Sequence, residues 1–308
     1  MPRIITLTPN PALDYAVQAD FVEPNRKLRC RDPQTHPGGG GINVARAVSR
    51  LGGETLAIFT TAGIYGAALM RVVAEEKVPM LTVPVSGETR LAFHIQEHRD
   101  GNEYRFNLPG AQLSEADAQN LLNAVGDNAK PGGFVVGSGS LPPGAPANFW
   151  AQAARAAKEK GARFVLDSIS GVPEALAEGI FMLRQNKYEY QALAGRDLAW
   201  PEEITEFAKK TVSDGSVERM VVTHGGDGSV MASKDGVARV GALKVKAHSA
   251  VGAGDSFVAA LLVGLLRGNS DKDALHYGMA GAAATRMTEG TALFDPADVE
   301  RLYETTLA

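Results

Sequence analysis

The sequence predicts an α/β fold: a three-layer α/β/α sandwich with a mostly parallel central sheet and a small additional β-sheet. Short runs rich in β-branched residues alternate with longer helical patterns, which is the rhythm of parallel strands joined by crossover helices. Two stretches, residues 12–36 and 88–108, break this rhythm because they show no helical periodicity. We expect them to form the small sheet, as a lid, within a single domain over residues 1–308. Ordinary surface loops are the alternative.

The elements of the large sheet follow in order. Alternating residues over 1–8 predict a first strand. Three strand and helix pairs come next: Thr55–Thr61 with Gly66–Lys77, Phe134–Gly137 with Asn148–Lys160, and Arg163–Asp167 with Val172–Ala177. The last third predicts helices over about 254–267, 271–288 and 296–307, and Pro296 suits the first position of the last one. Within the second irregular stretch, Leu91–His98 and Glu103–Leu108 flank Asp100–Gly101, which predicts a hairpin.

The composition excludes several classes of protein. Of 308 residues, 44% are hydrophobic and 21% charged, as in a globular protein that buries a sizeable core. The 31 Lys and Arg against 35 Asp and Glu give a formal charge of −4, so no general basic field holds nucleic acid or an anionic membrane. The longest apolar run, Phe257–Leu266, is too short for a bilayer, and the N-terminus lacks a signal-peptide core. A single cysteine, Cys30, indicates a reducing compartment, and we expect a cytoplasmic protein.

The first motif that indicates chemistry runs from Ser249 to Ser256 and precedes an apolar segment. A helix that is apolar on every side must be buried, and its N-terminus directs free N–H groups at whatever lies in front of it. Gly252 and Gly254 leave room for an anion to reach those amides. The carboxylate of Asp255 would repel that anion, so its presence in the turn indicates a chemical role. The helix dipole predicts a low pKa for this carboxylate. The alternative is that Asp255 only caps the helix.

The second motif is a run of four glycines, residues 38–41, that opens an amphipathic helix. Such a backbone can press against a polyhydroxylated ligand, and Asn43 offers both a donor and an acceptor. A flexible connector is the alternative, although connectors seldom lead directly into a well-patterned helix.

Together these segments resemble a known family. Four segments occur in the order found in ribokinase-like (PfkB-type) carbohydrate kinases: residues 38–47, Ser138–Gly144, Asn186–Glu189 and Val251–Ser256. The similarity covers essentially the whole chain. Thr6–Asp14 and Thr89–Arg90 are similar to the phosphosugar branch, and Lys27–Cys30 with the four glycines is most similar to the minor bacterial 6-phosphofructokinases.

The resemblance implies a role for each matching residue. Asp255 is the expected catalytic base, and the amides of Gly252, Ala253 and Gly254 are expected to stabilise the phosphoryl group. The residues expected to hold the sugar phosphate are Asp14, Lys27, Arg29, Gly39, Gly40, Asn43, Arg90 and Ser140. Those expected at the nucleotide are Asn186, Glu189, Thr223, Gly225, Gly228 and Ser249, with Glu189 and Asp167 as magnesium ligands. Lys27 and Arg29, two apart on a predicted strand, would share one face.

The implied reaction is transfer of the γ-phosphoryl group of ATP, with Mg²⁺, to a ketohexose phosphate, and fructose 6-phosphate is the expected acceptor. Tagatose 6-phosphate and fructose 1-phosphate remain open as acceptors, and a non-catalytic sugar-phosphate sensor is the alternative from another class. We expect a homodimer through the lid, whose strand edges need covering, and no nucleic-acid or membrane partner. Two departures from the family concern the nucleotide: Arg184–Gln185 stands where Lys-Pro is usual, and Thr223–His224–Gly225 where Ser-Leu-Gly is usual.

Overall fold

The large sheet forms the centre of the molecule. The computed structural model describes residues 3–307, and in this range nine strands run in the order β13-β12-β11-β10-β9-β8-β1-β4-β5. Their bounds are β1 Ile4–Thr8, β4 Thr55–Thr61, β5 Met80–Pro84, β8 Phe134–Ser138, β9 Arg163–Asp167, β10 Ile180–Asn186, β11 Val217–Thr223, β12 Ser229–Ser233 and β13 Gly236–Val240. All neighbours are parallel except β11-β12 and β12-β13.

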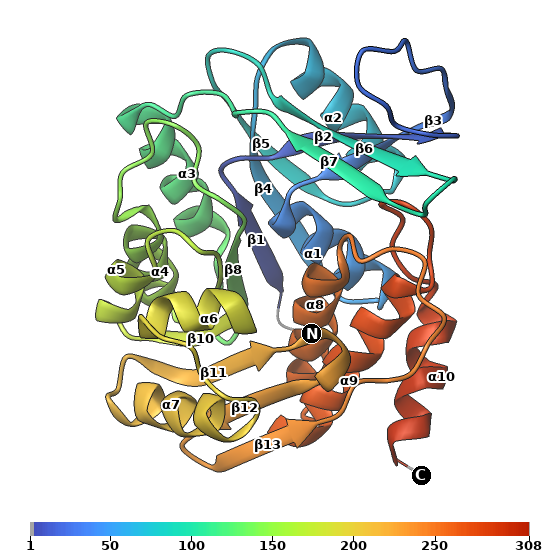
Figure 1. The fold of residues 1–308 in the computed structure, drawn as a ribbon. Helices are drawn as coiled ribbons and strands as arrows, with labels where there is room; N and C mark the ends of the chain where they lie inside the picture. The colour runs from blue at the N-terminus through green and yellow to red at the C-terminus, as the bar shows by residue number, and fades with distance from the viewer. Residues whose placement is uncertain (1–2, 308) are drawn as a thin grey trace.

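Helices cover both faces of this sheet (Figure 1). One face carries α1 Gly40–Arg50, α2 Gly63–Glu75, α8 Ala253–Leu266, α9 Asp271–Arg286 and α10 Pro296–Leu307. The other carries α3 Glu115–Asn128, α4 Phe149–Glu159, α5 Val172–Ala177, α6 Lys187–Ala194 and α7 Glu202–Ser213. Successive strand residues point to opposite faces, so Ile4 and Phe134 pack with α8 and α9, whereas Ile5 and Val135 pack with α3 and α4. The predicted three-layer sandwich is confirmed.

A second sheet of four strands, in the order β3-β2-β6-β7, lies at the top of Figure 1. Its strands are β2 Ala12–Ala19, β3 Cys30–Gly38, β6 Arg90–Glu97 and β7 Glu103–Asn107. The predicted hairpin is β6-β7, with Phe93 opposite Phe106. The small sheet that the irregular stretches predict is therefore present.

Four sequence predictions need correction or a limit. Lys27 and Arg29 do not lie on a strand, because pairing of β3 with β2 begins only at Cys30 opposite Ala19. The connection before it turns at Asn25, whose φ is 60°. The helix expected over 271–288 ends at Arg286, and the helix expected from residue 66 begins at Gly63. Residues 1–2 of the first predicted strand lie outside the described range.

The strand order of the large sheet diverges at β1. From β1 the chain builds β4 and β5 on one side and β8 to β11 on the other. In open parallel sheets, ligands bind outside the carboxyl ends of the strands where the order diverges in this way. The small sheet follows β1 directly in the chain. Nowhere in residues 3–307 does a helix have the length and apolarity to cross a membrane.

Candidate active site

The N-terminus of α8 forms the centre of the candidate site. Gly252 precedes the helix with a φ of 72°, a conformation that glycine adopts without strain, and no side chain caps the first turn. The helix is buried from Ser256 to Gly264, as its uniformly apolar sequence predicts. Its first residues, Ala253 and Gly254, line a cavity. The buried helix thus starts beside a cavity and has no side-chain cap. Binding of an anion by its first amides stays a prediction.

Asp255 lies in the first turn of α8 and faces the start of α1. Its Oδ2 accepts a hydrogen bond of 2.9 Å from Nδ2 of Asn43. A Cβ at Gly40 would come within 3.1 Å of Asp255 Oδ1 and 2.2 Å of Ser138 Oγ. Glycine at position 40 is therefore what lets α1 approach the carboxylate this closely.

The pKa of Asp255 is not low, contrary to the expectation from the helix dipole. Burial raises this pKa to about 7, and the negative charge of Asp167 adds to the rise. The hydrogen bond from Asn43 and the charge of Arg184 act in the opposite direction but are weaker than burial. A carboxylate whose pKa is near neutrality is suited to accept a proton.

The remaining glycines of the run bring α1 against the start of β2. A Cβ at Gly38 would lie 2.1 Å from Asp14 Oδ1, so only glycine leaves room for that carboxylate. Gly39, at the N-cap of α1, has a φ of 109°. The four glycines therefore pack closely between Asp14 and Asp255, and the flexible-connector interpretation is wrong.

Asp14 and Arg90 form the part of the site on the small sheet. Ala12 pairs with Arg90 across β2 and β6, which brings the two charged side chains near each other. Burial raises the pKa of Asp14 to about 6, against the lowering effect of Arg46 and Arg90. Arg90 donates to the carbonyl of Asn10 at 3.3 Å, and Asn10 Nδ2 donates to Ser140 Oγ at 3.1 Å. These hydrogen bonds connect Arg90 and Ser140 through Asn10, and the charge of Arg90 acts on the nearby Asp14.

Lys27 and Arg29 are placed differently from the other predicted substrate residues. Both are exposed on the connection between β2 and β3. Within residues 3–307, neither forms an ion pair or a side-chain hydrogen bond. The structure therefore does not bring them into contact with Asp14 or Arg90.

A cavity extends from α8 toward the far end of the large sheet. Four of its lining residues are predicted nucleotide residues, and they lie at the end of β10 or at and after the end of β11: Asn186, Thr223, Gly225 and Gly228. Its other walls are mainly apolar, with Arg286 as a charged member, and the apolar residues are Leu243, Val245, Phe257, Met279, Ala282 and Ala283. A cavity that is polar at one end and apolar at the other suits a ligand with a charged tail and a flat hydrophobic ring.

Arg184 occupies the polar end of this cavity. Its Nη1 donates to Asp167 Oδ1 at 3.1 Å, and its Nη2 donates to Thr223 Oγ1 at 2.7 Å. A Cβ at Gly254 would lie 3.0 Å from Nη1, so the guanidinium rests against the first turn of α8. Burial alone would lower the pKa of Arg184, but the nearby carboxylates, Asp167 foremost, raise it. A permanent positive charge thus lies beside the helix end.

Asn186 and Glu189 bond to each other at the start of α6. Asn186 Oδ1 accepts from the backbone N–H of Glu189 at 3.0 Å, and Glu189 Oε2 accepts from that of Asn186 at 2.7 Å. This capping box uses one oxygen of each side chain. The described residues contain no cluster of three His, Cys, Asp or Glu side chains able to hold a metal ion by themselves. The remaining oxygens of Glu189 and Asp167 fit an ion that is held mainly by phosphate groups and water, as Mg²⁺ often is.

Comparison with known proteins decides the family. The model of the pfkB family carbohydrate kinases matches residues 8–298. The chain belongs to this family.

Its relatives in the pfkB family are similar over nearly their whole length. An ATP-dependent 6-phosphofructokinase isozyme 2 of Mycobacterium tuberculosis is 39% identical over 98% of this chain and 89% of that protein. The Escherichia coli isozyme 2 is 37% identical over 98% of both chains. A crystal structure of E. coli phosphofructokinase-2 with potassium matches with a TM-score of 0.95 and 37% identity, covering 100% of both chains. The predicted family and fold are confirmed.

Both departures from the family pattern have a local structural basis. Gln185 is buried and donates from Nε2 to the carbonyl of Ser168 at 2.7 Å, a bond that proline could not make. His224 packs against Trp200, with ring centroids 5.2 Å apart. Ser249 Oγ accepts from the N–H of Val251 at 3.2 Å, which shapes the turn before α8.

Sequence reasoning gave no role to three polar residues of the site, Asn10, Arg46 and Arg184, although it noted Arg184 as a departure from the family pattern. Asn10 follows β1 and Arg184 lies on β10, so their positions at strand ends could have suggested them. Arg46 gave no such signal, because an arginine in an amphipathic helix is normally on the solvent side. The side chain of Arg46 is 1% exposed.

Proposed function

We propose that the chain transfers the γ-phosphoryl group of ATP to the free primary hydroxyl of a ketohexose phosphate, with fructose 6-phosphate as the preferred acceptor. One observation carries the proposal: the position of the Asp255 carboxylate at the start of α8. The predicted sugar-binding residues Asn43 and Asp14 are near it on one side, and the cavity lined by Arg184 begins on the other. A base in this position can reach an acceptor hydroxyl on one side while a nucleotide occupies the other.

The chemistry follows from these positions. The acceptor hydroxyl gives its proton to Asp255 while its oxygen bonds to the γ-phosphorus, and the bond from that phosphorus to the bridging oxygen breaks to release ADP. Such transition states are loose, so the protein contributes mainly by positioning the reactants and stabilising negative charge. The amides of Gly252, Ala253 and Gly254 would meet the moving group, and Arg184 would neutralise charge on the same side.

We assign magnesium to the carboxylates beside Arg184. Glu189 and Asp167 would hold the ion, by way of water and the phosphates of ATP. When bound, Mg²⁺ supplies charge neutralisation for the phosphate chain. Arg184 remains charged beside these carboxylates and complements the ion.

A phosphorylated acceptor suits the cations near the small sheet. On a chain of net charge −4, an anionic ligand needs local positive groups, and Arg90 is a partly buried one beside Asp14. Asp14, Asn43, Ser140 and the backbone of Gly39 and Gly40 would hold the sugar. In our proposal the small sheet acts as the lid of a single domain, and closure would add Lys27 and Arg29 to the phosphate.

Other phosphosugars are the second candidate. A 1-phosphofructokinase of Bacillus subtilis is 30% identical to this chain, and a D-tagatose-1-phosphate kinase of Bacillus licheniformis is 29% identical. The higher identity to the 6-phosphofructokinase isozymes, 37% and 39%, favours fructose 6-phosphate over tagatose 6-phosphate or fructose 1-phosphate. The position of Asp255 at the start of α8, where no side chain caps the helix, favours catalysis over a silent sensor.

We also propose a homodimer through the small sheet. Its side chains include Tyr15 and Phe106, which are 37% and 52% exposed, and Tyr15 packs edge-on against Phe93. Strands β3 and β7 are its open edges, and a second copy of the sheet would cover these apolar and unpaired groups.

The exposed thiol of Cys30 suits a cytoplasmic protein, where it would stay reduced.

An assay of ADP release with Mg²⁺ tests the proposal. The panel would contain fructose 6-phosphate, tagatose 6-phosphate, fructose 1-phosphate, free fructose and free ribose. We expect kcat/KM to be highest for fructose 6-phosphate and low for the free sugars. Preference for a free sugar would contradict the proposal, as would turnover that does not depend on any sugar.

A further inference from the structure

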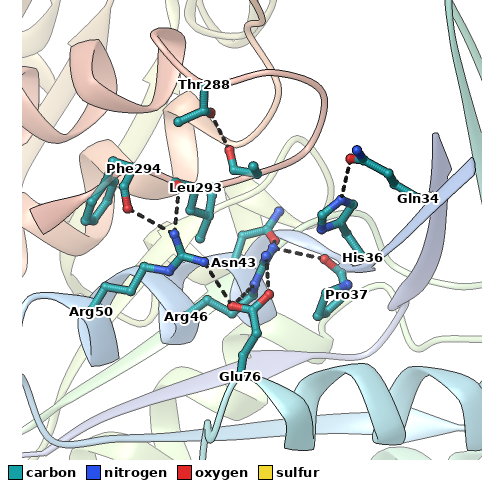
Figure 2. A network of polar contacts seen from close by, with 11 residues as sticks. Gln34, His36, Pro37, Asn43, Arg46, Arg50, Glu76, Thr288, Leu293 and Phe294 are labelled. Atoms are coloured by element: carbon teal, nitrogen blue, oxygen red, sulfur yellow. Dashed lines mark hydrogen bonds and ion pairs between the residues drawn. The ribbon is translucent and has the colours of Figure 1, made fainter. Parts of the chain in front are cut away.

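A buried arginine lies directly behind the pair formed by Asn43 and Asp255. Arg46 is one helical turn after Asn43 on α1, and Figure 2 shows it between Asn43, Pro37 and Glu76. Its Nη1 donates to Asn43 Oδ1 at 2.9 Å and to the Pro37 carbonyl at 3.2 Å. Its Nε donates to Glu76 Oε2 at 2.9 Å, and its Nη2 bonds the other oxygen of Glu76. Each of the three guanidinium nitrogens of Arg46 therefore has at least one hydrogen-bond acceptor.

The arginine determines which way the Asn43 amide faces. An amide has an acceptor oxygen at one end and a donor NH₂ at the other, whereas a guanidinium has only donors. Arg46 can therefore hold Asn43 only by its oxygen, which leaves the NH₂ directed at Asp255 Oδ2. Reversal of the amide would place its oxygen against the carboxylate and repel it.

Glu76 in turn fixes Arg46. The carboxylate bonds two nitrogens of Arg46, and Arg50 reaches the same carboxylate at 3.4 Å. Burial alone would raise the pKa of Glu76, but the hydrogen bonds and charges of Arg46 and Arg50 bring it below its usual value. Glu76 thus stays ionised at neutral pH. Arg50 also donates to the carbonyls of Leu293 and Phe294, at 2.7 and 3.0 Å, in the segment between α9 and α10 (Figure 2).

We propose that Arg46, held by Glu76, is a positioning residue that orients the Asn43 amide so that it anchors the catalytic carboxylate of Asp255. This inference rests on the proposed function, because it assigns a role toward the same reaction. Arg46 does not touch the reacting atoms in our proposal. It acts through Asn43, and its loss would affect the chemical step more than the binding of ATP.

Other charged groups face Asp255, and the experiment must separate them from Arg46. Asp167 lies at the end of β9, Arg184 on β10 and Asp14 on β2. None of them bonds Asn43 in the described part of the chain. A kinetic cycle that includes Asn43 therefore isolates the contribution of Arg46.

The test is a double-mutant cycle on kcat with ATP and fructose 6-phosphate. Arg46→Met is combined with Glu76→Met, since replacing both partners of a buried ion pair avoids leaving an isolated charge. We expect this pair of changes to lower kcat about tenfold or more, with the KM for ATP changed less than about threefold. In an Asn43→Ala background, the same pair should lower kcat less than about threefold further, because the group it orients is already gone.

The matched control is Arg50→Met on the same helix. Arg50 shares Glu76 but does not contact Asn43, so we expect kcat within about twofold of wild type. Thermal unfolding of each variant would show that it is folded. Full additivity of the two losses, or wild-type kcat in a folded Arg46→Met/Glu76→Met protein, would overturn the inference. Inactive wild-type protein would instead contradict the proposed function.

Discussion

The two ends of the proposed sugar-binding region are built in different ways. At the catalytic end, Asp255, Asn43 and Arg46 are linked by side-chain hydrogen bonds between α1 and α8. At the end on the small sheet, Lys27 and Arg29 are exposed on a connection outside the strands, and Arg90 alone is tied to the body, through Asn10.

We infer from this difference that the residues of the chemical step and the residues that recognise the sugar phosphate are held in different ways. A base must be held within about half an ångström of its productive position relative to the proton donor, which requires groups fixed by packing. Cations that attract a phosphate can act from a mobile, exposed segment, because charge attraction tolerates variation in distance. We therefore expect changes at α8 to lower kcat and changes near the small sheet to raise KM.

The largest effect should come from Asp255→Asn. This change removes the proposed base but keeps the shape and an acceptor for Asn43, so kcat should fall by about 10² to 10⁴ while the protein stays folded. Steady-state kinetics with fructose 6-phosphate would measure it. Turnover near that of wild type would remove Asp255 from the role of base and end the contrast between the two regions.

The next largest effect should come from Arg184→Met, which removes the positive charge beside α8. We expect kcat/KM for ATP to fall about 10- to 100-fold, in the range for loss of a charged hydrogen-bond donor. Arg184→Lys is the matched control, since lysine is usual in the family at this position, and it should retain most of the activity. If a folded Met variant uses ATP as well as wild type, Arg184 has only a structural role.

A smaller effect, on binding alone, is expected for Arg90→Ala. The KM for fructose 6-phosphate should rise about 10- to 100-fold, whereas the KM for ATP should change less than about threefold. Arg105→Ala, on the neighbouring strand β7, is the control, because Arg105 is exposed and pairs only with Glu103 in the described residues. Equal increases in both Michaelis constants would show that recognition and chemistry are not separated as we propose.

The smallest effect is on stability and depends on pH. The folded-state pKa of Asp255, about 7, lies above its ordinary value of 3.8, so ionising this group opposes folding. The stability it contributes is present below about pH 4 and is lost as the pH rises through 7. The free energy of unfolding of Asp255→Asn should therefore exceed that of wild type at pH 8, by roughly 1 to 4 kcal/mol, and should be similar to it near pH 4. A pH-independent difference would contradict the buried position of Asp255.

Much of the fold and of the candidate site could be predicted from local sequence. The apolar run after Asp255 required a buried helix, and the four glycines required close packing, because these constraints act on neighbouring residues. The pKa of Asp255 could not be predicted, since it depends on burial and on Asp167, which lies 88 positions earlier in the chain. The position of Lys27 and Arg29 was also missed, because where β3 begins depends on its pairing with β2.

The most direct test is a crystal structure of the wild-type protein with fructose 6-phosphate, Mg²⁺ and a non-hydrolysable ATP analogue. Our account predicts that an oxygen of Asp255 lies about 2.6 to 3.2 Å from the free primary hydroxyl, with the γ-phosphate of the analogue at the start of α8. A hexose whose primary hydroxyl lies away from Asp255, or a nucleotide bound outside the cavity that contains Arg184, would contradict it.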